Sequence, residues 1–175
     1  MKTSKNILLP IFASLVLLIS VAGKTTDSSV KIENAKKNNV VGSWNLTSCY
    51  LDDHGKQLDI FGLHPNGMVI FTEDFHFMVI VNNPDIPKFV SGDRSNGTPD
   101  EYKTAVINSL GTYGTYTIDH HGDFLEQHVI GSTFQNMNGI HSGNQITRKV
   151  EGNRMTENIK IADKVTIKLV WQRAQ

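Results

Sequence analysis

The chain has 175 residues with 17 basic and 17 acidic side chains, so it carries no net formal charge at neutral pH. Lys and Arg are scattered rather than clustered, which makes nucleic acid and anionic membrane surfaces poor candidates as partners. The single cysteine, Cys49, excludes an internal disulfide and is most simply interpreted as a small buried hydrophobe.

The first 22 residues have the order of an export signal. Lys2 and Lys5 precede an apolar run that ends in small residues, with cleavage expected after Ala22. A membrane anchor is the alternative, but Pro10 interrupts the run, which is short of the roughly 20 apolar residues that a span needs. No cysteine follows the run, so a lipid anchor is not expected. We therefore predict a secreted or periplasmic protein without stable membrane insertion once the signal is removed.

Residues 23–39 are polar and lack an apolar period, which indicates a flexible leader. One domain is expected to follow over residues 40–175, long enough for a single core. Without the two lysines of the signal, 15 basic residues face 17 acidic ones, a net charge of about −2.

The apolar pattern of this domain has a period of two, which is typical of half-buried strands. In the first run, one face is expected to carry Trp44, Leu46, Ser48 and Tyr50. Short turns join most runs, so neighbours in sequence should pair antiparallel. Eight strands are predicted, over residues 42–51, 68–74, 75–82, 111–119, 124–132, 144–151, 154–161 and 165–173.

Two segments break the strand pattern. Residues 83–97 are rich in Pro, Gly and polar side chains and should form a long loop. Residues 98–110 are predicted to be the one helix, because Thr98 is a good N-cap, Pro99 suits the first position and Glu101 completes a capping box. The loop and the helix are expected to shape access to the interior of the sheet.

Eight short strands with alternating faces must each bury one face. Closure into a ring removes the two unpaired edges that an open sheet would leave. A ring of this size can be filled by side chains or can hold one small ligand. The predicted fold class is therefore all-β, an eight-stranded antiparallel barrel with one short helix, in which Gly114 allows a bend or close packing.

Several short motifs follow one another in an order and spacing typical of a known family. They are GSWNLTS (42–48), FGLHPNG (61–67), FTED (71–74), TYGTY (112–116) and QHVIGS (127–132). Over residues 41–173 the chain resembles the lipocalin-like domain family, small calycin-like barrels found in many bacterial and fungal proteins. Gln127 stands where that family usually has His, and Arg148 is matched to an Arg that is usual near residue 147.

The resemblance implies a lipocalin-like (calycin) barrel whose narrow end is closed by a first-strand Trp stacked near an Arg of the last strand. Here these are Trp44 and Arg173, and such a cation–π contact contributes about 0.5–2 kcal/mol. The function expected first is binding of a small hydrophobic or amphipathic molecule in the barrel. A few relatives cyclise or isomerise a bound natural-product-like intermediate, so an enzyme is an alternative. A third is a structural or interaction domain that binds no ligand.

Glu126 and His128 are the candidate catalytic residues. Strand spacing puts them on one face, roughly 7 Å apart. If that face points into the barrel, a neutral His128 is a candidate general base, or else a structural histidine hydrogen-bonded there. If it points outward, Leu125, Gln127 and Val129 line the inside instead. The sequence leaves the orientation of this strand open.

Aromatic residues on the predicted strands could line a cavity or could simply fill the barrel as core. The candidate ligand-binding residues are Tyr50, Phe71, Tyr113, Tyr116, His128 and Arg148. Neither a metal nor another cofactor is predicted, because the seven histidines include no i, i+4 helical pair and no cysteine partner. The partner expected is a small hydrophobic ligand, and the oligomeric state is left open.

Overall fold

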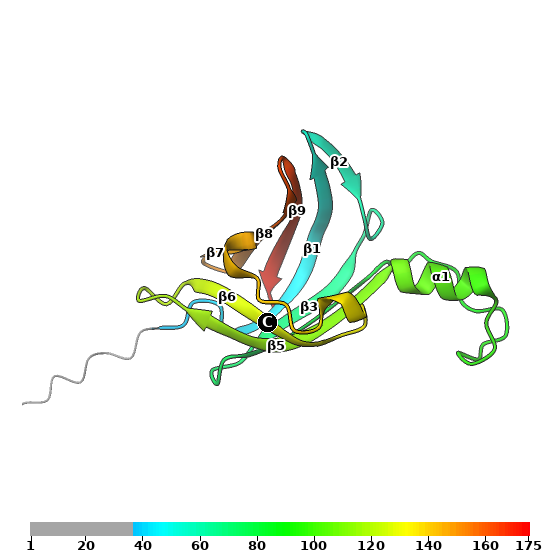
Figure 1. Ribbon diagram of the computed structural model, residues 1–175, viewed down its shortest axis with the longest axis horizontal. Helices are drawn as coiled ribbons and strands as arrows, with labels where there is room; N and C mark the ends of the chain where they lie inside the picture. The colour runs from blue at the N-terminus through cyan, green and yellow to red at the C-terminus, as the bar shows by residue number, and fades with distance from the viewer. Residues whose placement is uncertain (1–36) are drawn as a thin grey trace, which may run out of the picture. The chain divides into compact units, whose positions relative to one another are not determined.

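The computed structural model describes residues 37–175, so the predicted export signal and nearly all of the leader lie outside the described residues. One antiparallel sheet dominates these residues (Figure 1). Its strands are β1 (Gly42–Asp53), β2 (Lys56–Asp59), β3 (Asn66–Phe71), β4 (His76–Asn82), β5 (Ser109–Ile118), β6 (Phe124–Ser132), β7 (Ile146–Glu151), β8 (Arg154–Ala162) and β9 (Val165–Arg173). The helical elements are α1 (Pro99–Ile107) and the 3-10 turns η1 (Gln135–Met137) and η2 (Gly143–Gln145). Within this part of the chain, no helix combines the length and the apolar character needed to span a membrane.

The strands follow the order β6-β5-β4-β3-β1-β9-β8-β7, and β2 pairs with β1. Every pair is antiparallel, as the short predicted turns require. The all-β, lipocalin-like fold class and its eight strands are therefore confirmed. The additional strand, β2, was not predicted, because its four residues are all exposed and carry no alternating pattern.

The predicted start of the helix is also confirmed. Thr98 is the N-cap, its side chain accepts from the Glu101 backbone, and the Glu101 carboxylate accepts from the Thr98 backbone in return. The helix ends at Ile107, earlier than expected, because the chain from Ser109 onward pairs with β4. None of its residues is buried, so α1 adds nothing to the core, and it extends beyond the end of the sheet at which β5 begins (Figure 1).

Bulges decide which side chains face the interior. The β1–β9 register shifts between Leu46 and Ser48, which makes Thr47 an extra residue. The expected face is therefore wrong beyond Leu46: the buried position passes to Cys49, and Tyr50 turns to the outer face. The thiol of Cys49 is free and buried, as predicted, and burial followed by the charges of Glu157 and Asp59 raises its pKa to about 12.

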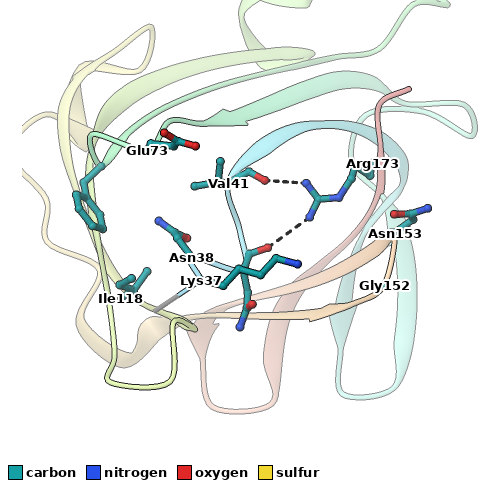
Figure 2. Close-up of a pocket in the computed structure, with 10 residues that line it drawn as sticks. Lys37, Asn38, Val41, Glu73, Ile118, Gly152, Asn153 and Arg173 are labelled. Atoms are coloured by element: carbon teal, nitrogen blue, oxygen red, sulfur yellow. Dashed lines mark hydrogen bonds between the residues drawn. The ribbon is translucent and has the colours of Figure 1, made fainter. Parts of the chain in front are cut away.

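Trp44 closes one end of the barrel. The Arg173 guanidinium lies 3.9 Å from the centre of its ring, the contact that the family resemblance implies. Arg173 also donates to the Val41 carbonyl at 2.7 Å, which ties the last strand to the segment entering β1 (Figure 2). Gly42 makes room for this arrangement: its φ is +122°, and a Cβ there would lie 2.6 Å from Arg173 Nη1. The close approach of Arg173 to the backbone therefore accounts for the glycine of the Gly-x-Trp motif.

The barrel is not a complete ring of paired strands, contrary to expectation. In hydrogen-bond order the sheet runs from β6 at one edge to β7 at the other. The chain between these two strands fills the seam instead. The Val129 amide donates to the Ile140 carbonyl, the Gly139 amide to the Val129 carbonyl, and the Ser142 amide to the Gln127 carbonyl. The connecting segment thus takes up the hydrogen-bonding positions of β6 that β7 would have used.

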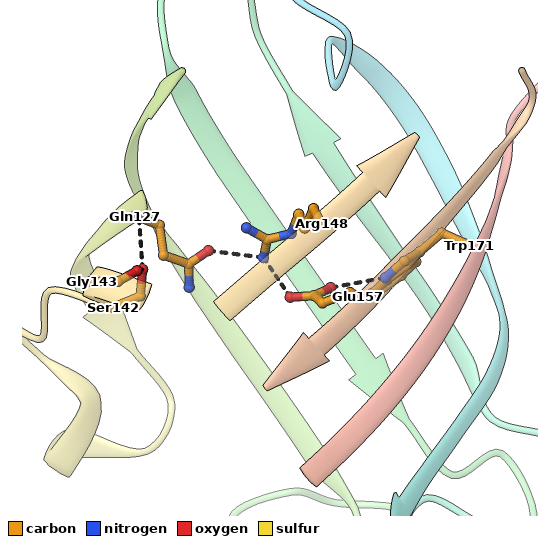
Figure 3. Close-up of polar contacts among 6 residues, drawn as sticks. All are labelled: Gln127, Ser142, Gly143, Arg148, Glu157 and Trp171. Carbon is orange, nitrogen blue, oxygen red and sulfur yellow. Dashed lines mark hydrogen bonds and ion pairs between the residues drawn. The ribbon is translucent and has the colours of Figure 1, made fainter. Parts of the chain in front are cut away.

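Buried side chains complete the seam (Figure 3). Arg148 Nη2 on β7 donates to Gln127 Oε1 on β6 at 2.9 Å and to Glu157 Oε1 on β8 at 2.5 Å. Trp171 Nε1 on β9 donates to the other Glu157 oxygen at 2.9 Å. The Arg148 guanidinium also lies against the rings of Phe71 and Phe124, at 5.1 and 4.2 Å. A chain of hydrogen bonds around one buried ion pair therefore connects four strands across the gap.

The first prediction concerns this ion pair. Replacing Arg148 by Met leaves the Glu157 carboxylate buried without its cation, so the free energy of unfolding should fall by about 3–5 kcal/mol. Glu157→Gln should cost a similar amount. The double variant should lose less than the two single losses added, by at least about 1.5 kcal/mol, in urea denaturation monitored by tryptophan fluorescence. Strict additivity would show that the two side chains are not coupled.

The second prediction concerns Gly114. A Cβ at this position would lie 1.9 Å from the His128 carbonyl oxygen, so β5 and β6 could not keep their spacing. Gly114→Ala should lower the free energy of unfolding by about 2–4 kcal/mol. Gly111→Ala on the same strand is the matched control, because its Cβ would meet only the Thr133 side chain at 3.4 Å. Equal losses in the two variants would contradict this account.

Candidate ligand-binding site

The two halves of the barrel differ in how tightly their interiors are packed. Around Trp44, the inward side chains of Trp171, Met155, Phe71 and Tyr116 are at most 2% exposed. Towards the other end, the inward residues of paired strands are only partly buried: Leu51 on β1, Ile167 on β9 and Ile159 on β8. The closed half is therefore solid core, and any space inside the barrel lies towards the open end.

A cleft of about 600 Å³ lies at this open end. Leu110 of β5 forms its floor and packs against the core cluster. Apolar side chains from four separate segments supply most of the remaining wall: Phe61, Phe89, Tyr102, Ala105, Val106, Ile107 and Phe134. The volume and the apolar lining are typical of small-molecule sites.

The helix presents apolar surface to this cleft without burying it. Val106 and Ile107 line the cleft and are 66% and 63% exposed. Phe134, opposite, is 54% exposed. The edge-to-face contact of Phe89 with Tyr102, at 5.4 Å, holds the long loop against the helix. The cleft therefore has a fixed wall of apolar groups that water covers in the free protein.

Arg94 is the only charged residue among those that line the cleft, and Ser109 and Thr133 add hydroxyl groups. A site with one cation and a predominantly apolar wall suits an elongated molecule with one polar end. The 83–97 loop contributes Phe89 and Arg94 to the lining, and the role in access predicted for it stays a prediction.

A larger cleft of about 800 Å³ lies at the closed end, where Val41 and Arg173 line it (Figure 2). Its lining is mixed, with Lys37, Asn38, Glu73 and Asn153 beside Phe75 and Ile118. Opposite charges and amides spread along its length would each have to be desolvated by an apolar guest. We therefore place the candidate site at the open end.

Three of the predicted ligand-binding residues come together, but in the packed half. Phe71 meets Tyr116 edge to face at 5.1 Å and carries Arg148 on its ring. The Tyr116 hydroxyl donates to the Thr72 carbonyl and accepts from the Asn38 amide, so its hydrogen bonds are used within the protein. Burial raises the pKa of Tyr116, opposed by the Asn38 hydrogen bond. These residues build the interior rather than a cleft.

The other predicted residues lie outside the interior. Tyr50 is on the outer face beyond the β1 bulge, and Tyr113 is 50% exposed. An extra residue at Leu125 shifts the β5–β6 register, so that Gln127 and Val129 are buried and Glu126 and His128 face outward. This settles the orientation that the sequence left open.

His128 stacks on His141, with ring centres 4.0 Å apart and planes within 4°. The pair sits over the seam, where residues 128 and 141 form an isolated bridge. From this side of the sheet His128 does not reach a molecule held in the barrel, so the enzyme alternative lacks the base assigned to it.

Among residues 37–175, His, Cys, Asp and Glu form no group of three or more that could hold a metal ion. His120 and His121 stack on one another at 3.7 Å in the turn before β6, and both are exposed.

Sequence reasoning missed the residues that matter most at the cleft: Phe61, Val106, Phe134 and Arg94. Val106 lies on a helix that the sequence predicts, but the surface that it faces could not be foreseen. Phe61 belongs to the FGLHPNG motif, and its place in the family pattern was the one feature of the sequence that could have marked it as a site residue.

Comparison with known proteins supports the fold assignment. A family model described as a lipocalin-like domain matches residues 41–174. A search of curated proteins finds no match. The matched range covers all nine strands, both walls of the cleft and the Trp44–Arg173 closure. The chain therefore belongs to the lipocalin-like domain family, whose barrel is a scaffold of the calycin ligand-binding type.

Proposed function

We propose that this protein is exported and binds a small hydrophobic or amphipathic molecule at the open end of its barrel. The observation that carries the proposal is the cleft under α1, where Val106 and Ile107 remain more than 60% exposed although they line an apolar wall. A ligand that covers this surface removes apolar area from water, which stabilises the complex by about 25 cal/mol per Å² buried. Export rests on the order of charged, apolar and small residues at positions 1–22.

The helix and the long loop form the movable side of the proposed site. Because no residue of α1 is buried, moving the helix outward disturbs little of the core. The Val90 amide and the Thr98 amide both donate to the Glu101 carboxylate, and these bonds hold loop and helix together as one unit. Because Val106 and Ile107 are already exposed, a ligand can reach the cleft without opening of the barrel, and movement of this unit would adjust the cleft around it.

Native mass spectrometry of protein purified from its own host tests the proposal most directly. A retained small molecule of low polarity is the expected result. An empty protein that also fails to bind an anilinonaphthalene dye would contradict a binding role.

Val106→Asn tests the position of the site. The change removes an apolar contact from the cleft wall at a solvent-exposed position, so dye affinity should fall roughly fivefold to tenfold while the melting temperature is kept. Val90→Asn is the matched control, since Val90 is 96% exposed and does not line the cleft. Unchanged affinity in Val106→Asn would place the dye elsewhere.

Arg94→Gln tests the polar end of the ligand. The variant should weaken binding of a fatty acid about tenfold but leave binding of the fatty alcohol of equal chain length nearly unchanged, as measured by dye displacement. Equal losses for the acid and the alcohol would show that Arg94 contributes packing and not charge.

A further inference from the structure

The outer face of the sheet carries a continuous apolar area across four strands. We call it the outer patch, and its residues are Met68 and Ile70 of β3, Met78 and Ile80 of β4, Tyr113 of β5 and Ile130 of β6. Met68 is opposite Ile80, Ile70 is opposite Met78, and Met78 is opposite Tyr113. The side chains therefore adjoin one another across the strands.

These strands are apolar on both faces. Val69, Phe71, Phe77 and Val81 point inward and are buried, which leaves the alternate positions for solvent. An antiparallel sheet that covers a core on one side usually places polar residues on the other. The outer patch departs from this rule over adjacent strands, and its residues are 36–59% exposed.

The size of the outer patch matches what a stable protein interface needs. Since a large apolar side chain carries on the order of 150–200 Å² of surface, the six expose roughly 500 Å² together. A standard interface buries about 800 Å² per partner, of which a little more than half is apolar. The outer patch thus supplies an apolar centre of the required area, and its rim would supply the rest.

The rim is uncharged on two sides, whereas the ion pair of His76 with Asp74 lies at the start of β4 and Glu126 lies farther along β6. Ser43 and Asn45 pair with Ile70 and Met68 on the β1 side. Towards β6, a hollow of about 570 Å³ opens between the patch residues and the 133–138 segment, and every residue that lines it is uncharged, including Gln135 and Asn138. The centre of this face carries no charge, so it offers no ionic contact to an acidic or basic partner, whereas two copies can meet there without repulsion.

Exposed apolar side chains and the hollow lie on the same outer face of the sheet. Met68 and Ile70 lie across β4 from the hollow, opposite Ile80 and Met78, and the lining of the hollow includes Gly111 and Gly131. A twofold interface uses the same surface of both copies, so that surface must provide both the side chains that insert and the hollow that receives them. Two sheets packed face to face also interdigitate side chains in the same way, about 10 Å apart.

We propose that two copies of this chain pack the outer faces of β3–β6 against each other about a twofold axis, with the outer patch as the centre of the interface. The cleft under α1 and the hollow beside the outer patch share only Thr133 among their lining residues, so the two surfaces adjoin at the 133–138 segment but are otherwise separate.

Sedimentation velocity of the full chain over a concentration series tests the proposal. The expected result is a species of twice the chain mass. Met78→Lys places a charge at the centre of the outer patch in both copies and should raise the dissociation constant at least about 100-fold. Ile80→Lys is a second variant with the same expected effect, and both positions are more than half exposed, so folding should persist by circular dichroism.

Ile161→Lys is the matched control, because Ile161 on β8 is 58% exposed, as is Ile80, and lies outside the outer patch. The control should remain dimeric. A full chain that stays monomeric at every concentration would overturn the proposal. So would a dimer that survives both patch variants, or one that the control also dissociates.

Discussion

The buried pair of Arg148 and Glu157 is the contact on which the closure of this barrel depends. The sheet ends at β6 and β7, and backbone hydrogen bonds do not join these edges directly. Arg148 reaches β6 through Gln127 and β8 through Glu157, while Trp171 satisfies the second carboxylate oxygen from β9. Burial lowers the pKa of Arg148, and the charge of Glu157 opposes that shift. An ion pair is costly to bury, but once buried it fixes geometry, because any displacement leaves a charge without its partner.

The seam explains a departure from the family pattern. Where the family usually has His, this chain has Gln127, which is 6% exposed and points inward. Its amide oxygen accepts from Arg148, and its backbone amide donates to the Ser142 hydroxyl at 2.9 Å. The side chain and the main chain of one residue thus link β6 to β7 and to the segment that fills the gap. A glutamine does this without titrating near neutral pH, which a histidine would not guarantee.

Strand positions were predictable from the sequence, because the period of two in the apolar residues follows from pleat geometry. The face of each side chain was not always predictable. One extra residue at Thr47 moved Cys49 inward, and extra residues at Leu125 and Ile130 reversed the alternation of β6 twice. Nothing local in the sequence marks these bulges. The cleft was beyond prediction for another reason: Phe61, Arg94, Val106 and Phe134 are brought together only by the tertiary fold.

The absence of buried residues in α1 has a consequence for how this scaffold can change. The helix draws its order from its own cap and from contacts with its preceding loop, whereas the barrel draws its order from the interior. The free energy that keeps the helix and its loop ordered is therefore largely independent of the free energy of folding of the barrel. On the proposed binding role, substitutions between residues 83 and 107 would alter which molecule is accepted while leaving the folding of the barrel intact, so selectivity would diverge among related chains without loss of the common architecture.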